Sequence, residues 1–591
     1  MPPSSLNWDQ LEYELTPWIK DAISSLGFES MTPVQASTIP LFSQNKDVIV
    51  EAVTGSGKTL AFVIPIIERI MKLDPVLIQK RHFNAVIVSP TRELSLQIEK
   101  VLQSVLKFNP KEQGIRTQVL VGGINSIDED LRTFQKTNPQ IIVATPGRLS
   151  EFLKFSNIVH TKNCEVLVLD EADKLLDLNF EKEMNNIFHS LPKQKRVGLF
   201  SATILNASSE FHKTGMRNPV KIVVNSKNHK PKTLKLNYHI LKPENKINDL
   251  FAYLDTFHFR KSIIYFPTCL SVDYFYSLFK QLTKDNNLND LKFYSLHGKL
   301  KTNSRIKTLE KFDSNNDSKS ILMTTDVAAR GIDIENVDLV IQLDPPTDPD
   351  VFLHRCGRTG RANNVGQAIV FLNEGREEDY IDFLQVRQIE VYDLEFNPRQ
   401  IIKQEQITKW ILVDRLRHDQ AIRAYVSFIR YYSKHSASSI FRLQSFNYLS
   451  LAKMYGLIRL PRMPELTNYL KDQFPKDGYL DPSIDFSNYK YLDEAKELKR
   501  IEEEKEQAKR AKKHEKKHEK NKIDENSAWS KKVQRKVNKE ERNAGKDIKK
   551  RELELVSSDD EHQETDWKDL VRQSKKEKKQ KKEIMGDFDD L

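Results

Sequence analysis

The chain has 591 residues, enough for several folded domains, and its 93 Lys and Arg outnumber its 83 Asp and Glu, giving a formal net charge of +10. This surplus favours a polyanionic partner, either nucleic acid or an acidic membrane surface, although a charged soluble surface also accounts for it. The three cysteines are too few and too far apart for a disulfide framework or a zinc cluster, which favours a reducing compartment. Residues 1–18 do not resemble a signal peptide, and no stretch of about eighteen apolar residues predicts a membrane span. We therefore expect an intracellular, soluble protein with no membrane partner.

Residues 1–37 form an N-terminal flank, and the first long α/β pattern occupies residues 38–226. Here short runs rich in Val, Ile and Leu are each followed by a polar turn and a helical pattern, as in buried parallel strands. The predicted strands lie at 47–53, 85–89, 140–144, 166–169 and 197–200. This alternation predicts a parallel-sheet α/β domain.

A polar, proline-containing segment at 227–234 predicts a linker, and a second α/β series follows at 235–400. The strands predicted in this second series lie at 262–266, 292–296, 320–324, 339–343 and 367–371. Residues 401–490 then change to a helical pattern rich in aromatic and basic residues. The sequence therefore predicts two tandem α/β domains followed by a helical C-terminal extension.

The last segment, residues 491–591, is dominated by charge. From residue 501 onward we count 27 Lys and Arg and 24 Asp and Glu among 91 residues, with three aromatic residues. Such a segment cannot bury enough apolar surface to offset its ordering entropy. It predicts a largely disordered tail, or a solvated single helix around 494–520. Its basic clusters at 509–513 and 575–582 fit nuclear import and sequence-independent RNA binding, although a charge run is also typical of a solvated surface.

The segment Ala52-Val-Thr-Gly-Ser-Gly-Lys-Thr59 follows a predicted strand and precedes a helical pattern. It is typical of a phosphate-binding loop, with Ala52 in place of the usual first glycine, and a ligand-free glycine-rich turn is the alternative. Its glycines let backbone N–H groups approach phosphates, and the helix N-terminus adds a favourable dipole. Lys58 is expected to reach the β- and γ-phosphates, and Thr59 to bind Mg²⁺. The nucleotide contacts predicted in this loop are Thr54, Gly55, Ser56, Gly57, Lys58 and Thr59.

Acidic residues follow the apolar strand pattern Val166-Leu-Val-Leu169. A carboxylate beside a buried strand needs a metal or a basic partner, because an unpaired buried charge is costly. Asp170 fits an Mg²⁺ ligand, and Glu171 fits the group that orients or deprotonates the attacking water. Taken alone, such a strand end is equally typical of a helix N-cap, but together with the phosphate loop it favours a metal–nucleotide site.

Through Asp170-Glu-Ala-Asp173 the chain resembles the DEAD-box RNA helicases, whose motifs it matches in order from about residue 18 to 375. The resemblance implies two RecA-like domains, ATP and Mg²⁺ as cofactors, and RNA as the partner. Gly27-Phe-Glu-Ser-Met-Thr-Pro-Val-Gln35 resembles the adenine-reading motif of the family. By this resemblance Gln35 bonds the adenine edge and Phe28 stacks on its face, with Trp18 as an isolated aromatic residue upstream. An amide suits adenine because it offers a donor and an acceptor together.

The same resemblance assigns roles to further motifs in both domains. RNA-backbone contacts are implied for Arg92, Gly122, Gly123, Thr145, Arg148, His297, Gly298, Arg305 and Thr324. Coupling of nucleotide to domain closure is implied for Asp173, Ser201, Thr203 and His354. Nucleotide contacts are implied for Gly331 and Asp333, and Arg358 and Arg361 resemble the paired arginine fingers that stabilise the transferring phosphoryl group. Thr302 departs from the glutamine that many relatives carry there, and no RNA role is assigned to it.

The segment between residues 423 and 464 resembles the C-terminal extension shared by several nucleolar ribosome-assembly helicases. Within that set, residues 15–18, residues 38–42 with 51–54, and the tail segments 528–532 and 566–567 resemble the large-subunit (60S) branch. This resemblance implies action on pre-rRNA in pre-60S particles with ribosome-assembly proteins, by a monomer in the nucleus and nucleolus. For the extension, the alternatives are a generic helical accessory domain and another nucleolar DEAD-box helicase that shares it. For the activity, two alternatives remain at this point: a DNA helicase or translocase with the same ATPase core, and an ATP-gated RNA clamp or scaffold with little unwinding. The adenine-reading and DEAD motifs disfavour the first, and intact Lys58, Glu171, Arg358 and Arg361 disfavour the second.

Overall fold

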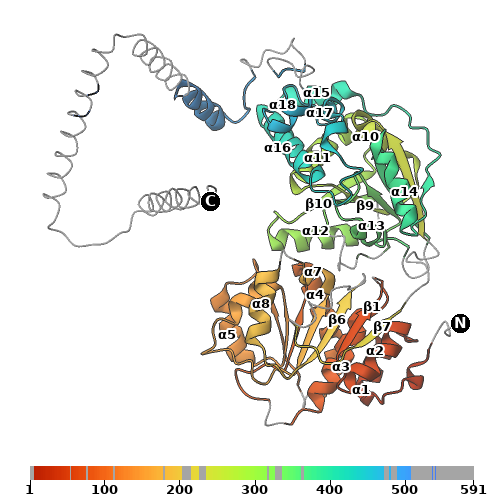
Figure 1. Cartoon of the computed structure of the whole chain (residues 1–591), viewed down its shortest axis with the longest axis vertical. Coiled ribbons are helices and arrows are strands. Elements are labelled where there is room, and N and C mark those ends of the chain that lie inside the picture. The colour runs from red at the N-terminus through yellow and green to blue at the C-terminus, as the bar shows by residue number, and fades with distance from the viewer. Residues whose placement is uncertain are drawn as a thin grey trace, which may run out of the picture. The chain divides into compact units, whose positions relative to one another are not determined.

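The structure is a computed structural model of the whole chain (Figure 1). It describes residues 6–53, 55–74, 78–110, 114–177, 180–201, 214–224, 234–315, 318–326, 334, 336–360, 365–470, 478–480, 489–506, 536 and 540. The chain divides into two compact units, residues 1–492 and 493–591. The second unit is helical at 494–506, and the rest of the predicted tail lies outside the described residues except for Lys536 and Glu540. Among the helices within the described ranges, none combines the length and apolar character needed to cross a bilayer.

The first α/β domain is built on a seven-stranded parallel sheet of order β3-β4-β2-β5-β6-β1-β7. Its strands are β1 (Val48–Glu51), β2 (Ala85–Val88), β3 (Thr117–Leu120), β4 (Ile141–Ala144), β5 (Val166–Asp170), β6 (Arg196–Ser201) and β7 (Val220–Val223). All five predicted strands are present, and β3 and β7, at the two sheet edges, are additional. The central strands β1, β2, β4 and β5 are buried along their whole length, as continuous apolar runs in a two-sided sheet require.

Helices cover both faces of this sheet, so its apolar side chains form two separate cores. One core includes side chains of α1 (Pro17–Ser25), α2 (Pro33–Ser43), α3 (Lys58–Met71) and α4 (Arg92–Leu106). The other includes side chains of α5 (Ile127–Thr137), α6 (Pro146–Phe152), α7 (Ala172–Leu175) and α8 (Glu181–Ser190). A 3-10 turn, η1 (Trp8–Gln10), precedes α1. The carboxyl ends of the strands therefore share one sheet edge, where the predicted nucleotide motifs lie.

The second domain repeats this plan with a parallel sheet of order β10-β11-β9-β12-β13-β8-β14. Its strands are β8 (Leu234–Leu241), β9 (Lys261–Tyr265), β10 (Leu291–Leu296), β11 (Lys319–Thr324), β12 (Leu339–Gln342), β13 (Gly366–Asn373) and β14 (Tyr392–Asp393). Its helices are η4 (Pro243–Asn245), α10 (Lys246–Thr256), α11 (Cys269–Asp285), α12 (Thr302–Ser314), α13 (Pro349–Cys356), η5 (Arg376–Glu378) and α14 (Asp379–Val386). The prediction of two tandem RecA-like parallel-sheet domains is confirmed.

The predicted helical extension consists of α15 (Gln404–Leu412), α16 (Arg415–Tyr432), η6 (Leu443–Ser445), α17 (Tyr448–Met454) and α18 (Pro464–Leu470). Its apolar side chains belong to the same core as the second sheet, because α16 packs along α11. Tyr274 Oη of α11 donates a hydrogen bond to the Tyr455 carbonyl oxygen at 2.6 Å, deep inside this core. The extension is thus continuous with the second domain in its packing.

Candidate functional site

The phosphate loop connects β1 to α3, and both of its glycines adopt left-handed backbone conformations. Gly55 has a φ of 81° and Gly57 a φ of 86°, values that cost little only in glycine. Gly57 is the N-cap of α3, so the unpaired N–H groups of the first helical turn face the loop. Lys58 is 7% exposed, and its Nζ donates a hydrogen bond to the Ala52 carbonyl oxygen at 3.0 Å. The loop therefore combines backbone donors with a buried lysine amine.

Two acidic side chains from β5 lie beside this lysine. Asp170 ends the strand, Glu171 follows with a left-handed φ of 53°, and both carboxyl groups are buried. Glu171 Oε1 lies 4.0 Å from Lys58 Nζ. Burial, and next the Glu171 carboxylate, raise the pKa of Asp170 to about 7, while Lys58 acts in the opposite direction. Since a bound cation favours the ionised carboxylate, the arrangement is suited to a metal ion.

The predicted adenine-reading residues lie next to the phosphate loop. Gln35 Nε2 donates to the Gly57 carbonyl oxygen at 3.3 Å, while Gln35 Oε1 accepts from the Thr32 N–H at 2.9 Å within the capping box of α2. Phe28 is 43% exposed, so its ring is accessible for stacking. Trp18, in contrast, is buried in the first core, where packing accounts for it without a nucleotide.

The polar groups around the loop fit a nucleotide with its metal ion. Ser56 Oγ and Glu171 Oε2 are buried and have no hydrogen-bond partner within the part of the chain that the structure describes. Orphaned polar atoms beside a lysine and a helix N-terminus fit a hydrated, phosphate-bearing ligand better than a closed core. Asp170 and Thr59 offer oxygen atoms of the kind Mg²⁺ prefers. Across the described residues no three His, Cys, Asp or Glu side chains are grouped to hold a metal.

Two of the four predicted coupling residues, Ser201 and Asp173, are in contact. Ser201 ends β6, and its Oγ donates a hydrogen bond to Asp173 Oδ1 on α7 at 2.9 Å. This bond connects two neighbouring strand ends at the nucleotide edge of the sheet. Five further predicted site residues, Thr54, Thr203, Gly331, Asp333 and Arg361, lie outside the described residues.

The predicted RNA contacts of the first domain follow three strands of its sheet. Arg92 is the first residue of α4, Gly122 and Gly123 follow β3, and Thr145 is the N-cap of α6. Arg148 is more enclosed than the sequence implies. Its Nη2 donates to the Asn125 carbonyl oxygen at 2.7 Å, and its Nε lies 3.7 Å from Asp130 Oδ2. The hydrogen bond from Arg148 to Asn125 therefore stabilises the loop before α5.

The predicted RNA contacts of the second domain lie at the ends of β10 and β11. His297 is 1% exposed, and its Nε2 lies 2.7 Å from Asp273 Oδ1 of α11. Burial lowers the pKa of His297, but hydrogen bonds with Asp273 and Cys269 outweigh it and raise the pKa to about 9. Gly298 is exposed. The buried Thr324 donates its hydroxyl to the Thr325 carbonyl oxygen at 3.2 Å. The backbone at Gly298, and not the His297 ring, is thus the accessible part of this turn.

The two RecA-like domains are in contact through residues that the sequence analysis did not link to one another. Thr302, to which no role was assigned, accepts a hydrogen bond from Arg92 Nη1 at 2.6 Å and donates one to the Gly122 carbonyl oxygen at 3.3 Å. One helical turn later, Arg305 Nη2 lies 2.5 Å from Glu93 Oε2. The spacing of Thr302 and Arg305, which places both on one face of a helix, is the signal that could have suggested a shared partner.

The motif around His354 begins in the last turn of α13 and continues past its end in the second domain. Arg358 is 1% exposed, and its Nε donates to the His354 carbonyl oxygen at 3.2 Å. His354 is 5% exposed. Between them, Arg355 is also buried, and its Nε donates to Asp326 Oδ1 at 2.7 Å. These contacts of Arg358 and of Arg355 Nε lie within the second domain.

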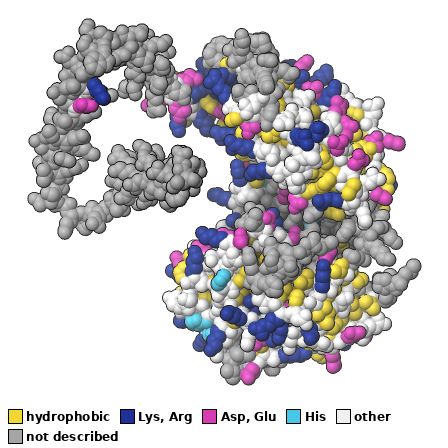
Figure 2. All heavy atoms as spheres, in the orientation of Figure 1, with side chains coloured by type: hydrophobic (Ala, Val, Ile, Leu, Met, Phe, Trp, Pro, Cys, Tyr) yellow, Lys and Arg dark blue, Asp and Glu magenta, His cyan; other side chains and the backbone are white. Residues whose placement is uncertain are grey.

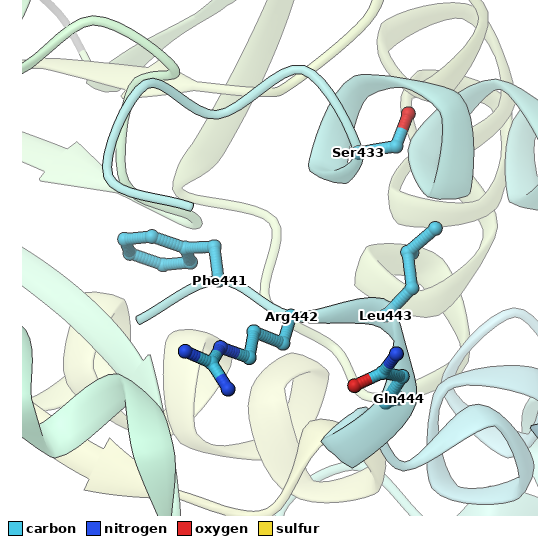
Figure 3. A pocket seen from close by; sticks show the side chains of 5 residues that line it. All are labelled: Ser433, Phe441, Arg442, Leu443 and Gln444. Atoms are coloured by element: carbon cyan, nitrogen blue, oxygen red, sulfur yellow. The ribbon is translucent and has the colours of Figure 1, made fainter. Parts of the chain in front are cut away.

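A separate hollow of about 380 Å³ lies on the extension, away from the motifs above. Ser433, the C-cap of α16, lies on one side of it, and Phe441 to Gln444 line the other (Figure 3). Arg442 and Gln444 are exposed at its rim.

Comparison with protein families gives matches along most of the chain. Residues 32–211 match the model of the DEAD/DEAH box helicases, and residues 245–363 match the helicase conserved C-terminal domain. Residues 414–463 and 491–591 match the C-terminal extension and the C-terminal tail of ATP-dependent rRNA helicases of the SPB4-like type.

Solved structures share the fold of the first unit. A structure of Mss116p bound to single-stranded RNA and AMP-PNP aligns with a TM-score of 0.67 at 25% identity, covering 79% of this chain and 95% of that one. A structure of Saccharomyces cerevisiae Dbp5 bound to RNA and ADP BeF3 aligns with a TM-score of 0.56 at 27% identity, covering 66% and 95%.

Two full-length relatives are considerably more similar. The ATP-dependent rRNA helicase SPB4 of Eremothecium gossypii is 51% identical over 601 residues, covering 99% of this chain and 100% of that protein. The SPB4 helicase of Saccharomyces cerevisiae is 49% identical over 607 residues, with coverage of 99% and 100%. With its RecA-like domains, its SPB4-type C-terminal segments and this identity along nearly its whole length, the chain belongs to the SPB4 family of DEAD-box ATP-dependent rRNA helicases.

Proposed function

We propose that this RNA helicase binds ATP with Mg²⁺ at the β1–α3 edge of its first domain and hydrolyses it with Lys58, Thr59, Asp170 and Glu171. The observation that carries this proposal is the meeting of Lys58 and Glu171 at 4.0 Å, beside the N-terminus of α3. Amine, carboxylate and helix N-terminus are three of the groups that recur at phosphoryl-transfer sites. The proposed metal ligands are Thr59 and Asp170.

Each of these residues has a role that follows from its contacts. Lys58 Nζ exchanges its bond to the Ala52 carbonyl for phosphate oxygens, and the N–H groups of the loop hold the same phosphates. Glu171 Oε2, which has no hydrogen-bond partner among the described residues, orients a water molecule and takes its proton. Bound ATP with Mg²⁺ supplies the phosphoryl group that this water accepts. Arg358 and Arg361 add positive charge from the second domain.

We further propose that RNA is held by both domains through backbone contacts, and that this RNA is pre-rRNA within pre-60S particles of the nucleolus. Most of the implied contact residues lie at or just after strand ends in each sheet, whereas Arg305 lies within α12. On the face shown in Figure 2, Lys and Arg side chains gather around an indentation of the first unit, as phosphate binding requires. The names of the relatives, which are rRNA helicases, support the substrate. We propose that the protein acts there as a monomer together with ribosome-assembly proteins.

The test replaces the two central side chains and measures separate steps. Glu171→Gln keeps the size of the side chain but cannot take a proton, so ATP and RNA should still bind while single-turnover hydrolysis falls by about a hundredfold or more. Lys58→Ala should instead weaken ATP binding itself.

Lys72→Ala is the matched control, because Lys72 lies at the other end of the same helix and pairs with Glu68 at 3.7 Å. It should leave both steps unchanged. Hydrolysis at the normal rate in Glu171→Gln would show that another group handles the water. Wild-type single-turnover hydrolysis that RNA does not accelerate would favour the RNA-clamp alternative.

A further inference from the structure

The turn before α13 lacks some backbone N–H donors. It leads into residues His354 to Arg358, called the arginine motif below. After β12 the chain runs through Asp344-Pro-Pro-Thr347 into α13, which ends at Cys356 just before Arg358. Pro345 and Pro346 have no N–H group, so this turn cannot be fixed by donating hydrogen bonds at those positions. Its carbonyl oxygens must find donors elsewhere, because the turn is largely buried.

The extension supplies these donors from the C-terminal end of α16 and the turn that follows. Tyr431 Oη donates to the Pro345 carbonyl oxygen at 2.9 Å. Ser436 donates to the Thr347 carbonyl oxygen twice, from its N–H and from its Oγ, each at 2.9 Å. Three hydrogen bonds from the extension therefore hold the turn that precedes α13.

Arg355 of the arginine motif also donates hydrogen bonds at this turn. Arg355 Nη1 donates to the Asp344 carbonyl oxygen at 3.1 Å and to Gln342 Oε1 at 3.3 Å. Its guanidinium lies over the Tyr265 ring, 5.1 Å from the centroid. Tyr431 and Arg355 thus bind adjacent carbonyl groups, of Pro345 and Asp344, from opposite elements. A shift of α16 would move the backbone from which Arg355 and Arg358 project.

We infer that Tyr431 and Ser436 are positioning residues for ATP hydrolysis, which fix the turn before α13 so that Arg358 keeps the arrangement that the reaction needs. The inference rests on the proposed role of Arg358. It makes the extension a part of the ATPase, because the hydrogen bonds come from the same chain: the one from Tyr431 is partly buried and the one from the Ser436 hydroxyl is exposed. Most of the proposed ATP contacts lie in the first domain, and the two in the second domain, Gly331 and Asp333, are outside the turn before α13, so loss of these hydrogen bonds should leave ATP binding nearly unchanged.

The experiment measures RNA-stimulated ATP hydrolysis by the full chain at saturating RNA, with kcat, KM for ATP and the thermal unfolding midpoint determined for each variant. Tyr431→Phe removes a hydroxyl that bonds both the Pro345 carbonyl oxygen and the Arg355 side chain, and should lower kcat about three- to tenfold. The KM for ATP should stay within about twofold. Ser436→Ala, which keeps the backbone bond, should have a smaller effect in the same direction.

Tyr425→Phe is the matched control on the same helix, because Tyr425 Oη donates to the Tyr448 carbonyl oxygen at 3.2 Å, inside the extension. It should change the unfolding midpoint at least as much as Tyr431→Phe while leaving kcat unchanged. In an Arg358→Ala background, Tyr431→Phe should cause no further loss in single-turnover hydrolysis.

Equal loss of kcat in both tyrosine variants would overturn the inference, because stability alone would then explain it. Unchanged kcat in Tyr431→Phe, with Arg358→Ala inactive, would also overturn it while leaving the proposed function intact. Full activity of Arg358→Ala would instead refute the proposed role of Arg358, and with it this inference.

Discussion

Arg305 and Glu93 join the two RecA-like domains through a buried ion pair, in which Arg305 Nη2 lies 2.5 Å from Glu93 Oε2. Both side chains are less than one-tenth exposed. Removal of one partner leaves a buried, unpaired charge, which costs up to about 3 kcal/mol unless water can reach it. The pair therefore stabilises this contact between the domains.

We expect Arg305→Ala to shift the population of the nucleotide-free protein toward separated domains, because opening lets water reach Glu93. Fluorescence energy transfer between a dye on each domain measures this shift. Arg69→Ala is the control, since Arg69 Nη2 pairs with Glu165 at 2.6 Å within the first domain. Equal energy transfer in Arg305→Ala and Arg69→Ala would contradict the expectation. Exchange of the two charges, with Arg305→Glu and Glu93→Arg together, should restore part of the wild-type signal.

Gly57→Ala should impair the phosphate loop by two separate effects. The residue has a left-handed φ of 86°, and an added Cβ would lie 2.6 Å from Gln35 Nε2. Strain of the backbone alone costs about 1 kcal/mol, and displacement of Gln35 adds to it. We expect a lower unfolding midpoint and weaker ATP binding in equilibrium titrations. Gly147→Ala in α6 is the stability control, because an added Cβ there meets nothing within 4 Å, and it should be neutral or slightly stabilising. Equal stability of the two variants would argue against a strained Gly57.

The pair of His297 and Asp273 predicts a pH dependence of stability with a definite sign. Burial lowers the pKa of His297, but hydrogen bonds with Asp273 and Cys269 raise it more. The pKa in the folded protein is therefore about 9 instead of 6.5. The stabilisation is therefore complete below pH 6.5 and is lost as the pH rises through about 9. Because Asp273 is half exposed, screening limits the loss to about 1 kcal/mol.

Chemical denaturation at pH values from 6 to 10 measures this loss. Asp273→Asn should remove the part of the slope between pH 6.5 and 9, and Cys269→Ser should remove less of it. A slope unchanged in Asp273→Asn would assign the titration to other groups.

The charged tail should bind RNA without sequence preference. Deletion of residues 507–591 removes most of its basic clusters. We expect the variant to need more RNA for half-maximal ATPase stimulation and to show a shallower dependence of RNA affinity on salt, because fewer counterions are released. The kcat at saturating RNA should be unchanged, since no ATPase motif lies there. An identical salt dependence with and without the tail would show that it does not contact RNA.

Structural features that depend on neighbouring residues could be predicted from the sequence, and those that depend on distant residues could not. The buried strands were predictable because runs such as Ala85–Val88 are apolar throughout. The edge strand β3 was missed because its exposure alternates and it carries Thr117 and Gln118, so no continuous apolar run marks it. The two-residue strand β14 is too short for any periodic pattern.

In the candidate site, too, only the local motifs could be predicted from the sequence. The phosphate loop and the Asp170–Asp173 motif could be predicted because the necessary residues are adjacent in the chain. The Arg305–Glu93 pair spans 212 positions, and nothing in either local segment identifies the other. His297 was expected at the RNA surface, but its ring is buried against Asp273, an orientation that depends on how α11 packs. Its proposed RNA contact stays a prediction, with the Gly298 backbone as the exposed group.

The hydrogen bond from Gln35 to Gly57 has a consequence for nucleotide selection. The residue expected to read the base is the same one that tethers the carbonyl of the phosphate loop's last glycine. An amide that turns to engage adenine must loosen or redirect this tether, whereas a purine with the opposite donor and acceptor pattern would leave it in place. Guanine nucleotides would then be discriminated by the conformation of the loop at Gly57 as well as by their affinity.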